Sequence, residues 1–581
     1  SIRRQRQMCI RDSIGGTFTD LVLDEDGRRH TAKVLTTPER PADGLIQGVD
    51  SILEQSGVEP SAINLVVHGT TLATNALIER KGARTALVTT MGHRDTLEMA
   101  FENRFDQYDI QADRNPPLVG RALRFEVAER MNYRGEVLTP LDDDSVAALI
   151  PAFRSAHIDS VAVGLLHAYA NPAHEQRVAD ILTTAMPDLS ISLSSDVCPE
   201  IREYERQTTT VANAYVRPMI AGYLGDLESR LADSGLRCPC LLMTSGGSLV
   251  TIETASRFPI RLVESGPAGG AILAAHMARQ FGEDRLISFD MGGTTAKICL
   301  IDDGQPLLNR EFEVDRAHRF MKGSGTPLKI PVIEMVEIGA GGGSIASVDR
   351  LDRIRIGPQS AGADPGPACY ARGGTHATVT DANLVLGRLD PAEFAGGTMT
   401  LDPQAANVAL ARNIGDRLAL GPMDTARGMI EIVDENMAGA ARVHAAERGL
   451  ELEGRTMIAF GGGAPLHAAR LATKLGIERI IVPTDAGVGS AVGFLLAPMA
   501  YEVVRSRYAR LDELDSAGLT ALFGDMEEEA ISTVRLAAPD ADLSIARHGY
   551  ARYVGQGHEI KVELPELSLI HISEPTRPLY I

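Results

Sequence analysis

Three things are scarce in this sequence of 581 residues, and each scarcity excludes a class of protein. No apolar run reaches the roughly 18 residues that a membrane-spanning helix needs, and no signal peptide is recognisable. We therefore expect a soluble, cytoplasmic protein with no membrane partner. Positive charge is outweighed, with 57 Lys and Arg against 77 Asp and Glu and a net charge of -20. So acidic a chain argues against nucleic acid or an anionic membrane as its partner.

Cysteine is also scarce. Six cysteines are scattered along the chain, and Cys238 and Cys240 form the one close pair, with no second Cys or His cluster at zinc spacing. We expect reduced, mostly buried thiols, and Cys369 in GPACY is a weak candidate for the site.

What is present is a recurring order of apolar strand, turn and helix. It occurs at 63–82, 85–99, 160–184 and 261–282. This rhythm predicts an α/β protein with mixed or parallel sheets. A hydrophobic content of 44% over this length is enough for two or three domains with their own cores.

One segment occurs twice. IGGTFTDLVLDEDG at 14–27 superposes without a gap on MGGTTAKICLIDDG at 291–304. Each copy runs from a Gly-Gly-Thr turn into an alternating apolar strand and then into an acidic-Gly turn, which is the pattern of a β-hairpin. Two copies of one phosphate-binding hairpin predict a duplicated architecture.

The first copy has an oddity, because Ser13 stands where the second copy has Asp290. Residues 3–13, RRQRQMCIRDS, look like one reading frame of a DNA-library adapter, and residues 567–577, LSLIHISEPTR, look like the opposite adapter. We interpret 1–13 and 567–581 as sequencing artefacts, so that native sequence begins at Ile14 and ends near Glu566. The alternative is a genuine basic N-terminal arm. On the first interpretation Ser13 replaces an aspartate.

A third glycine-rich segment lies at 456–483, TMIAFGGGAPLHAARLATKLGIERIIVP. Its order of strand, Gly-rich turn, helix and strand places the N–H groups of Gly461, Gly462 and Gly463 at the start of a helix. That position favours a phosphate or the close approach of a purine. The alternative is a tight structural turn.

The long motifs together resemble one family. IGGTFTDLVLDEDG, VVHGTTLATNALIERKG, FDMGGTTAK, EIGAGGGSIASVD, GADPGPACYARGG, TVTDANLVLGRLD and FGGGAPLHAARLA are similar to the hydantoinase A / 5-oxoprolinase family over nearly all of 14–566. The resemblance implies the fold of the actin-like, sugar-kinase and heat-shock ATPase superfamily, with duplicated ribonuclease-H-like domains and a nucleotide cleft. It also implies ATP and Mg²⁺ as cofactors, a B-type partner subunit in a hetero-oligomer, and a small cyclic amide as substrate.

The same resemblance divides the chain. We expect an N-terminal domain at 14–195, an ATPase domain at 196–500 and the start of a truncated C-terminal domain at 501–566, because family members commonly continue further.

The needs of phosphoryl transfer assign roles to the motifs, since the protein must hold phosphates, Mg²⁺ and the acceptor oxygen in line. Asp290 is the expected Mg²⁺ ligand, acting through water, and Asp20 and Lys297 are the other catalytic candidates because they take equivalent places in the two copies. For Asp20 the alternative is a solubilising hairpin residue. The expected nucleotide-binding residues are Gly15, Gly16, Thr17, Thr19, Gly292, Gly293, Thr294, Thr295, Gly461, Gly462 and Gly463.

A second set of polar loop residues is predicted to contact the substrate. His68-Gly-Thr-Thr is the best of these segments, because it follows a strand and α/β sheets bind ligands at such ends. For each single residue a structural role is the competing interpretation. The set is His68, Thr70, Thr71, Asn75, His93, Arg94, Asp95 and Asp381. The run Gly339–Gly343 is expected to shape the backbone and is also able to nest an anion.

Three functions are compatible with these motifs. The first is the ATP-using subunit of an amidohydrolase that phosphorylates a lactam or cyclic imide, of the hydantoin or 5-oxoproline type, on its carbonyl oxygen. The second is the corresponding subunit of an acetone or other ketone carboxylase. The third is a non-catalytic ATP-binding regulatory or chaperone module. The motifs count against the third, and we prefer the first.

Overall fold

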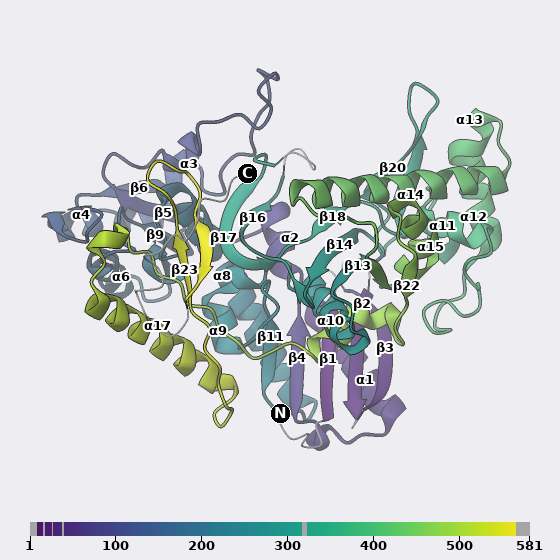
Figure 1. Ribbon diagram of the computed structural model, residues 1–581, viewed down its shortest axis with the longest axis horizontal. Helices are drawn as coiled ribbons and strands as arrows, with labels where there is room; N and C mark the ends of the chain where they lie inside the picture. The colour runs from purple at the N-terminus through teal and green to yellow at the C-terminus, as the bar shows by residue number, and fades with distance from the viewer. Residues whose placement is uncertain (1–7, 15–17, 26, 38–39, 317–321, 565–581) are drawn as a thin grey trace. The chain divides into compact units, whose positions relative to one another are not determined.

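The computed structural model describes residues 8–14, 18–25, 27–37, 40–316 and 322–564. These residues form two compact units (Figure 1). Unit 1 comprises the described residues within 1–84, 103–118 and 212–498, and unit 2 those within 85–102, 119–211 and 499–581. Each unit is built from separate stretches of chain, whereas the sequence-based division has three consecutive ranges. The chain leaves unit 1 after Arg84, returns to it for 103–118, enters it again within the long helix α8 (Glu203–Asp233) and leaves it after Pro498.

The first sheet of unit 1 contains the first predicted hairpin. Its strand order is β12-β11-β4-β1-β2-β3. β2 is antiparallel to both β1 and β3, whereas β4 is parallel to β1 and β11 is parallel to β4. The strands are β1 (Met8–Ile14), β2 (Phe18–Glu25), β3 (Arg28–Leu35), β4 (Leu65–Gly69), β11 (Cys240–Met243) and β12 (Leu249–Thr251).

The second sheet of unit 1 repeats this plan. Its order is β15-β14-β13-β21-β22, with β18 also paired to β14. β14 is antiparallel to both β13 and β15, whereas β21 is parallel to β13 and β22 is parallel to β21. The duplicated ribonuclease-H-like α/β fold expected from the sequence is therefore confirmed. The strands are β13 (Arg285–Met291), β14 (Ala296–Asp302), β15 (Gln305–Pro306), β18 (Val336–Ile338), β21 (Thr456–Phe460) and β22 (Arg479–Ile481).

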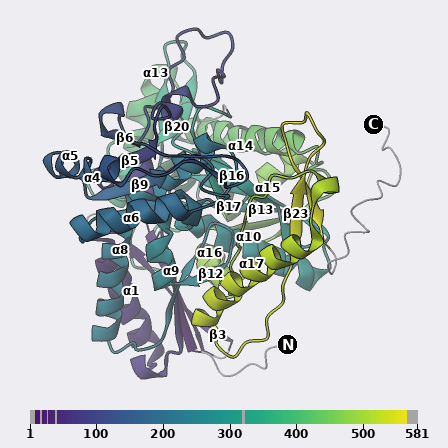
Figure 2. The same ribbon diagram turned by 90° about the vertical axis from the view of Figure 1, so that its left-hand side faces the viewer.

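Two helices together contact both sheets of unit 1: α10 (Ser265–Phe281) packs on β13 and β11, and α16 (Gly489–Phe494), labelled in Figure 2, packs on α10 and on β1. They pack closely because glycines face each other. A Cβ atom on Gly493 would lie 1.7 Å from the carbonyl oxygen of Gly269, so no larger residue fits at this crossing.

The remaining helices of unit 1 pack on its strands or on one another. Apolar residues of the second sheet, including Phe289 and Ile298, form one core with Met437 and Leu471 of these helices. The helices are α1 (Pro41–Ser56), α2 (Leu72–Ile78), α9 (Ile252–Arg257), α11 (Val379–Val385), α12 (Pro403–Leu410), α13 (Asp416–Leu418), α14 (Pro422–Glu447) and α15 (Ala464–Leu475). Two hairpins complete the unit, β16 (Leu308–Val314) with β17 (Thr326–Ile333) and β19 (Ser344–Val348) with β20 (Ile354–Ser360).

Unit 2 is built on a four-stranded parallel sheet of order β10-β9-β5-β6. Figure 2 shows its C-terminal helix α17 beside β23, and Arg547 pairs there with Glu527 of α17. The sheet strands are β5 (Thr85–Thr90), β6 (Arg124–Val127), β9 (Ser160–Gly164) and β10 (Ser190–Leu193), and the small pairs are β7 (Arg130–Met131) with β8 (Val137–Thr139) and β23 (His548–Ala551) with β24 (Ile560–Glu563). The helices are α3 (Thr96–Met99), α4 (Asp143–Ala147), α5 (Ile150–Ser155), α6 (Ala173–Ala185), α7 (Ser194–Val197) and α17 (Ser516–Ala537).

Two further findings concern membrane spans and cysteines. Among the helices of the described ranges, none combines the length and apolarity needed to cross a bilayer. All six cysteines are free thiols and four of them are buried, which confirms the expectation of reduced, mostly buried thiols.

Candidate functional site

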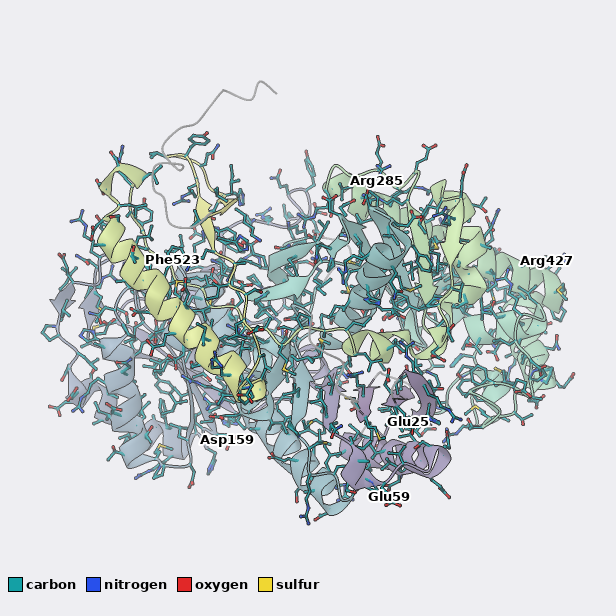
Figure 3. The ribbon with its side chains drawn as sticks, turned by 60° about the horizontal axis from the view of Figure 1, so that its bottom comes forward. Glu25, Glu59, Asp159, Arg285, Arg427 and Phe523 are labelled. Carbon is teal, nitrogen blue, oxygen red and sulfur yellow. The ribbon has the colours of Figure 1, made fainter. Side chains whose placement is uncertain are left out.

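The two hairpins have the same register, residue for residue. In the first, Ser13 pairs with Asp20 and Ile14 with Thr19. In the second, Asp290 pairs with Lys297 and Met291 with Ala296. This correspondence is the one that the ungapped sequence alignment predicts. The predicted phosphate-binding residues Gly15, Gly16 and Thr17 lie outside the described residues. Figure 3 marks Glu25 and Arg285, which lie at the ends of the hairpins away from Ile14 and Met291.

Each hairpin carries a row of charge across its strands. In the first sheet Asp20 pairs across to Lys33 and forms an ion pair with it. In the second sheet Lys297 pairs across to Glu337, with Nζ 3.5 Å from Oε1. The order of charge is therefore inverted between the copies. A cross-strand pair of opposite charge stabilises its sheet, so each row holds its own geometry.

Charged residues of both rows affect the pKa of Asp290. Burial raises the pKa of Asp290 to about 6, although Lys297 and a hydrogen bond from Ser490 lower it. Asp20 of the first hairpin also raises this pKa, and Lys33 lowers it. The charges of the first hairpin thus lie within electrostatic reach of the carboxylate on the second, as a shared site requires.

Burial lowers the pKa of Lys297, but the carboxylates of Glu337, Glu264 and Asp290 raise it by more. The net shift is upward, so the ammonium group stays charged at neutral pH. A permanent cation across the strand from a carboxylate suits a site for phosphate oxygens.

The second Gly-Gly-Thr turn is exposed at Gly292 and Thr294, and backbone hydrogen bonds from Gly342 and Gly343 fix its position. The N–H of Gly342 donates to the carbonyl of Gly292 at 3.0 Å, and that of Gly343 donates to Gly293 at 2.6 Å. A Cβ atom on Gly341 would lie 2.5 Å from the backbone of Thr294. The run Gly339–Gly343 therefore shapes the turn. It does not nest an anion through Gly342 and Gly343, whose N–H groups are already bonded.

The third glycine loop is bound to the second hairpin. The N–H of Gly463 donates to the carbonyl of Met291 at 2.8 Å, and the N–H of Gly461 donates to Ala486 at 2.7 Å. Two of the three N–H groups predicted for a ligand are thus used within the protein. Gly462 is exposed, and a Cβ atom there would meet open space, so it is the glycine of this loop most available to a ligand.

We expect Gly461→Ala to destabilise the fold. Gly461 has φ +89, and a Cβ atom on it would lie 2.3 Å from Oδ1 of Asp290 and 2.7 Å from the carbonyl of Met291. Strain from positive φ and overpacking together should cost about 2–4 kcal/mol. Thermal unfolding measures this, with Gly462→Ala in the same loop as the control. Equal unfolding temperatures for the two variants would show that Gly461 tolerates a side chain.

His68 lies at the end of β4 and is fully buried. Its Nδ1 lies 2.6 Å from Oδ2 of Asp12 and its Nε2 lies 3.0 Å from the hydroxyl of Tyr223, so both ring nitrogens have partners within the protein. A substrate contact for His68 stays a prediction. The equivalent pair in the second sheet is apolar, Phe289 beside Ala459.

Two further predicted site residues are buried, and their ligand contacts stay predictions. Asp381 is fully buried and forms a capping box with Thr378 at the start of α11, and its Oδ1 accepts from the N–H of Cys369. Thr19 is also fully buried, with its hydroxyl 3.2 Å from that of Thr36. Burial raises the pKa of Cys369 well above its usual value, which removes it as a reactive thiol.

The other predicted substrate residues occupy two places. Thr70 is buried at the end of β4, while Thr71 and Asn75 lie at the start of α2 with more exposed side chains. His93, Arg94 and Asp95 belong to unit 2, in the loop after β5. There, His93 contacts Arg130 and Asp95 forms an ion pair with Arg121. For all of these a substrate contact stays a prediction.

Sequence reasoning missed two residues of this site. The Ser490 hydroxyl donates to Oδ2 of Asp290 at 3.0 Å, and Glu264 lies 3.7 Å from Nζ of Lys297. Both come from segments far from the repeated hairpins, so their spacing carries no signal. For the SGPAGG run after Glu264, the sequence pattern predicts only a turn before a helix.

The residues present fit a magnesium ion held mainly by water and phosphate. Within the described residues there is no group of three or more His, Cys, Asp and Glu side chains placed to bind a metal. Mg²⁺ does not need such a cage, since it is commonly held by one or two carboxylates with several waters and substrate phosphates. Asp290, partly buried beside an exposed glycine turn, is a suitable carboxylate.

Several relatives share most of this chain. An uncharacterised protein of Methanocaldococcus jannaschii is 36% identical over 557 residues, which cover 94% of this chain and 81% of the relative. The caprolactamase subunit alpha of Pseudomonas jessenii is 33% identical, covering 95% and 79%. The acetophenone carboxylase gamma subunit of Aromatoleum aromaticum is 32% identical, covering 85% and 68%.

Two solved structures share the fold over nearly the whole chain. The ATP-dependent caprolactamase of Pseudomonas jessenii has a TM-score of 0.80 at 32% identity and covers 96% of this chain and 81% of its own. A nucleotide-free acetone carboxylase, described as carrying out ATP-dependent acetone carboxylation, has a TM-score of 0.80 at 26% identity, with coverage of 97% and 81%.

Two family models account for most of the sequence. The hydantoinase/oxoprolinase N-terminal region matches residues 12–186, and the hydantoinase/oxoprolinase model matches residues 206–503. Together with the duplicated hairpins and the relatives above, these matches show that the chain belongs to the hydantoinase/oxoprolinase family.

Proposed function

We propose that this chain is the ATP-using subunit of an amidohydrolase that phosphorylates the carbonyl oxygen of a lactam or cyclic imide. The observation that carries the proposal is that Asp290 pairs across the strand with Lys297, while charged residues of the first hairpin also shift the pKa of Asp290. Support for a cyclic amide comes from the similarity to the ATP-dependent caprolactamase.

In this proposal the chain positions charges rather than forming covalent bonds. The exposed turn at Gly292 and Thr294 brings backbone and hydroxyl groups to the phosphates. Asp290 would hold Mg²⁺ through its waters, and the ion would supply positive charge to the transferring phosphoryl group. Lys297 stabilises the charge that develops there. Transfer to the carbonyl oxygen gives an imidate phosphate, whose carbon water can attack where an amide carbon is inert.

A partner chain belongs to the proposal. The caprolactamase and carboxylase relatives are named as subunits, so we infer that this chain works in a hetero-oligomer with a B-type subunit. In such a complex the water-adding step is free to lie on either chain. Co-purification of the two co-expressed chains tests this inference, and a stable monomer in their presence would contradict it.

A ketone carboxylase is the second candidate. The fold is equally similar to acetone carboxylase, and the acetophenone carboxylase subunit is almost as close in sequence as the caprolactamase subunit. The same phosphoryl-transfer machinery would then act on an enol oxygen or on bicarbonate. We favour the amidohydrolase because the family models name hydantoinase and oxoprolinase.

A substrate panel separates the two candidates. The chain is co-expressed with its B-type partner, both as it stands and with Ser13→Asp, and ADP release is measured with lactams, hydantoins, 5-oxoproline, and ketones with bicarbonate. We expect a cyclic amide to raise ADP release at least about tenfold, as activation of a bound acceptor should. Stimulation by ketones alone would favour the carboxylase, and no ATP turnover with either would contradict both.

A further inference from the structure

Glu264 stands out because its backbone is in a conformation that residues other than glycine rarely adopt. It is the last residue before α10, with φ +62 and ψ 25. In such positions glycine is the usual choice, since a side chain there is strained. Non-glycine residues held in this region are concentrated at functional sites, where the surroundings hold them in place.

The Glu264 carboxylate pairs with Lys297 and does not cap its own helix. At the start of a helix an acidic side chain commonly accepts from the free N–H groups of the first turn, but Glu264 makes no such capping bond. Its side chain is instead 11% exposed and lies with Oε2 3.7 Å from Nζ of Lys297. Burial raises the pKa of Glu264 and Lys297 lowers it. The buried carboxylate is therefore matched to one particular cation.

The backbone around Glu264 reaches the other half of unit 1. Its N–H donates to the hydroxyl of Thr74 in α2 at 3.2 Å. The hydroxyl of the next residue, Ser265, donates to the carbonyl of Thr70 at 3.0 Å. Thr70 follows β4, which is paired to β1 of the first hairpin. Glu264 thus joins the second hairpin, through Lys297, to the loop beside the first.

We propose that Glu264 is a positioning residue for phosphoryl transfer, which holds the Lys297 ammonium in register with the Thr70–Thr74 segment. This inference rests on the proposed function and adds a residue to it. Held from both sides, Lys297 keeps one position relative to Asp290 and to the segment predicted to contact substrate. A group displaced by about 1 Å at a phosphoryl-transfer site can cost about 100-fold in rate.

Four variants test the proposal in the full chain with its partner, in both the Ser13 and the Ser13→Asp forms. Glu264→Gln removes the charge, and Glu264→Gly removes the carboxylate while suiting the left-handed backbone. Lys297→Met is combined with Glu264→Gln in a double-mutant cycle. Glu337→Gln is the comparison variant, because Glu337 lies 3.5 Å from the same ammonium group but is 44% exposed, so that water replaces part of its contribution.

We expect Glu264→Gln and Glu264→Gly each to lower kcat for ATP turnover about 100-fold with KM for ATP changed less than about threefold. Glu264→Gly should keep or raise the unfolding temperature, which a purely structural role of the side chain would not allow. Lys297→Met should abolish the effect of Glu264→Gln, because both act through one ammonium group. Glu337→Gln should lower kcat clearly less than Glu264→Gln does, because its more exposed carboxylate is worth less to the ammonium group.

Two results would overturn the positioning role alone. One is that the parent chain turns over ATP and the Glu264→Gln variant has the same kcat. The other is a loss from Glu264→Gln that multiplies with the loss from Lys297→Met, which would mean that the two residues act independently. Absence of ATP turnover in the parent in both Ser13 forms would instead contradict the proposed function, and this inference with it.

Discussion

Ser13→Asp is expected to raise the affinity for Mg²⁺-ATP about 100-fold, a gain of about 2.7 kcal/mol. The backbone register places residue 13 opposite Asp20, as Asp290 is opposite Lys297, so an aspartate there would supply the second symmetry-related carboxylate. Calorimetric titration with Mg²⁺-ATP and with ATP in the presence of a chelator measures the effect. The gain should require Mg²⁺, since a carboxylate alone would repel phosphate.

The same substitution should slightly destabilise the protein without ligand. Two carboxylates directly opposite on neighbouring strands repel each other, at a cost of roughly 0.2–1 kcal/mol, and Lys33 offsets part of it. The control is Asp12→Asn, which keeps the contact with His68 and should leave nucleotide affinity unchanged. A loss of affinity in Asp12→Asn with none gained in Ser13→Asp would show that the hairpin alignment is wrong.

The environment of β1 bears on the origin of Ser13. Arg11 and Asp12 are buried in the middle of the sheet, where the second copy has Ser288 and Phe289. Nε and Nη1 of Arg11 and Oδ1 of Asp12 have no hydrogen-bond partner among the described atoms. Buried polar atoms without a hydrogen-bond partner are unfavourable for a stable fold. This burial supports the interpretation of 1–13 as adapter sequence, which stays a prediction.

Asp290→Asn is expected to abolish ATP turnover while stabilising the protein without ligand. A carboxylate that orients Mg²⁺ contributes several kcal/mol to charge stabilisation, so turnover should fall at least about 1000-fold. Because burial raises the pKa of Asp290 from 3.8 to about 6, its ionised form destabilises the fold by up to about 3 kcal/mol. Asparagine keeps an oxygen that can accept from Ser490 without that charge.

The stability difference between Asp290→Asn and the parent should depend on pH in a defined direction. A carboxyl whose pKa is higher in the folded state favours folding fully below about pH 3.8, and the contribution is lost as pH rises through about 6. The stability gained by Asp290→Asn over the parent should therefore be negligible below about pH 3 and largest above about pH 7. Turnover within a factor of a few of the parent would remove Asp290 from the mechanism, whereas an unchanged stability difference across this range would contradict the raised pKa.

Much of the fold could be predicted because its signals are local and repeated. The ungapped match of 14–27 to 291–304 carries the register of both hairpins, since strand alternation ties each residue to a face. The same match makes Asp20 equivalent to Lys297, and each of them lies opposite the residue that the match predicts, Ser13 or Asp290. The order of strand, glycine turn and helix likewise predicts β21 and α15.

The remaining site residues depend on contacts between distant segments. The sequence predicts His68 to be a loop residue at the end of a strand, but in the structure Asp12 and Tyr223 bind its two ring nitrogens. Asp381 reads as a polar loop residue, yet it caps the start of α11. Nothing local indicates which polar residue will find a buried partner, because burial is decided by the whole fold. Glu264 was missed for the same reason, since its partners lie in α2 and β14.

Transfer of ¹⁸O from a labelled carbonyl to phosphate tests the central claim most directly. In the proposed reaction the carbonyl oxygen attacks the γ-phosphorus and ADP leaves. One water then adds at carbon and the ring nitrogen departs, and a second water at the same carbon displaces phosphate with the labelled oxygen. With the B-type partner, Ser13→Asp and a carbonyl-labelled lactam or hydantoin, we predict one labelled oxygen in each phosphate released. Ring opening that leaves all the label in the carboxylate would contradict phosphorylation of the carbonyl oxygen followed by attack at carbon.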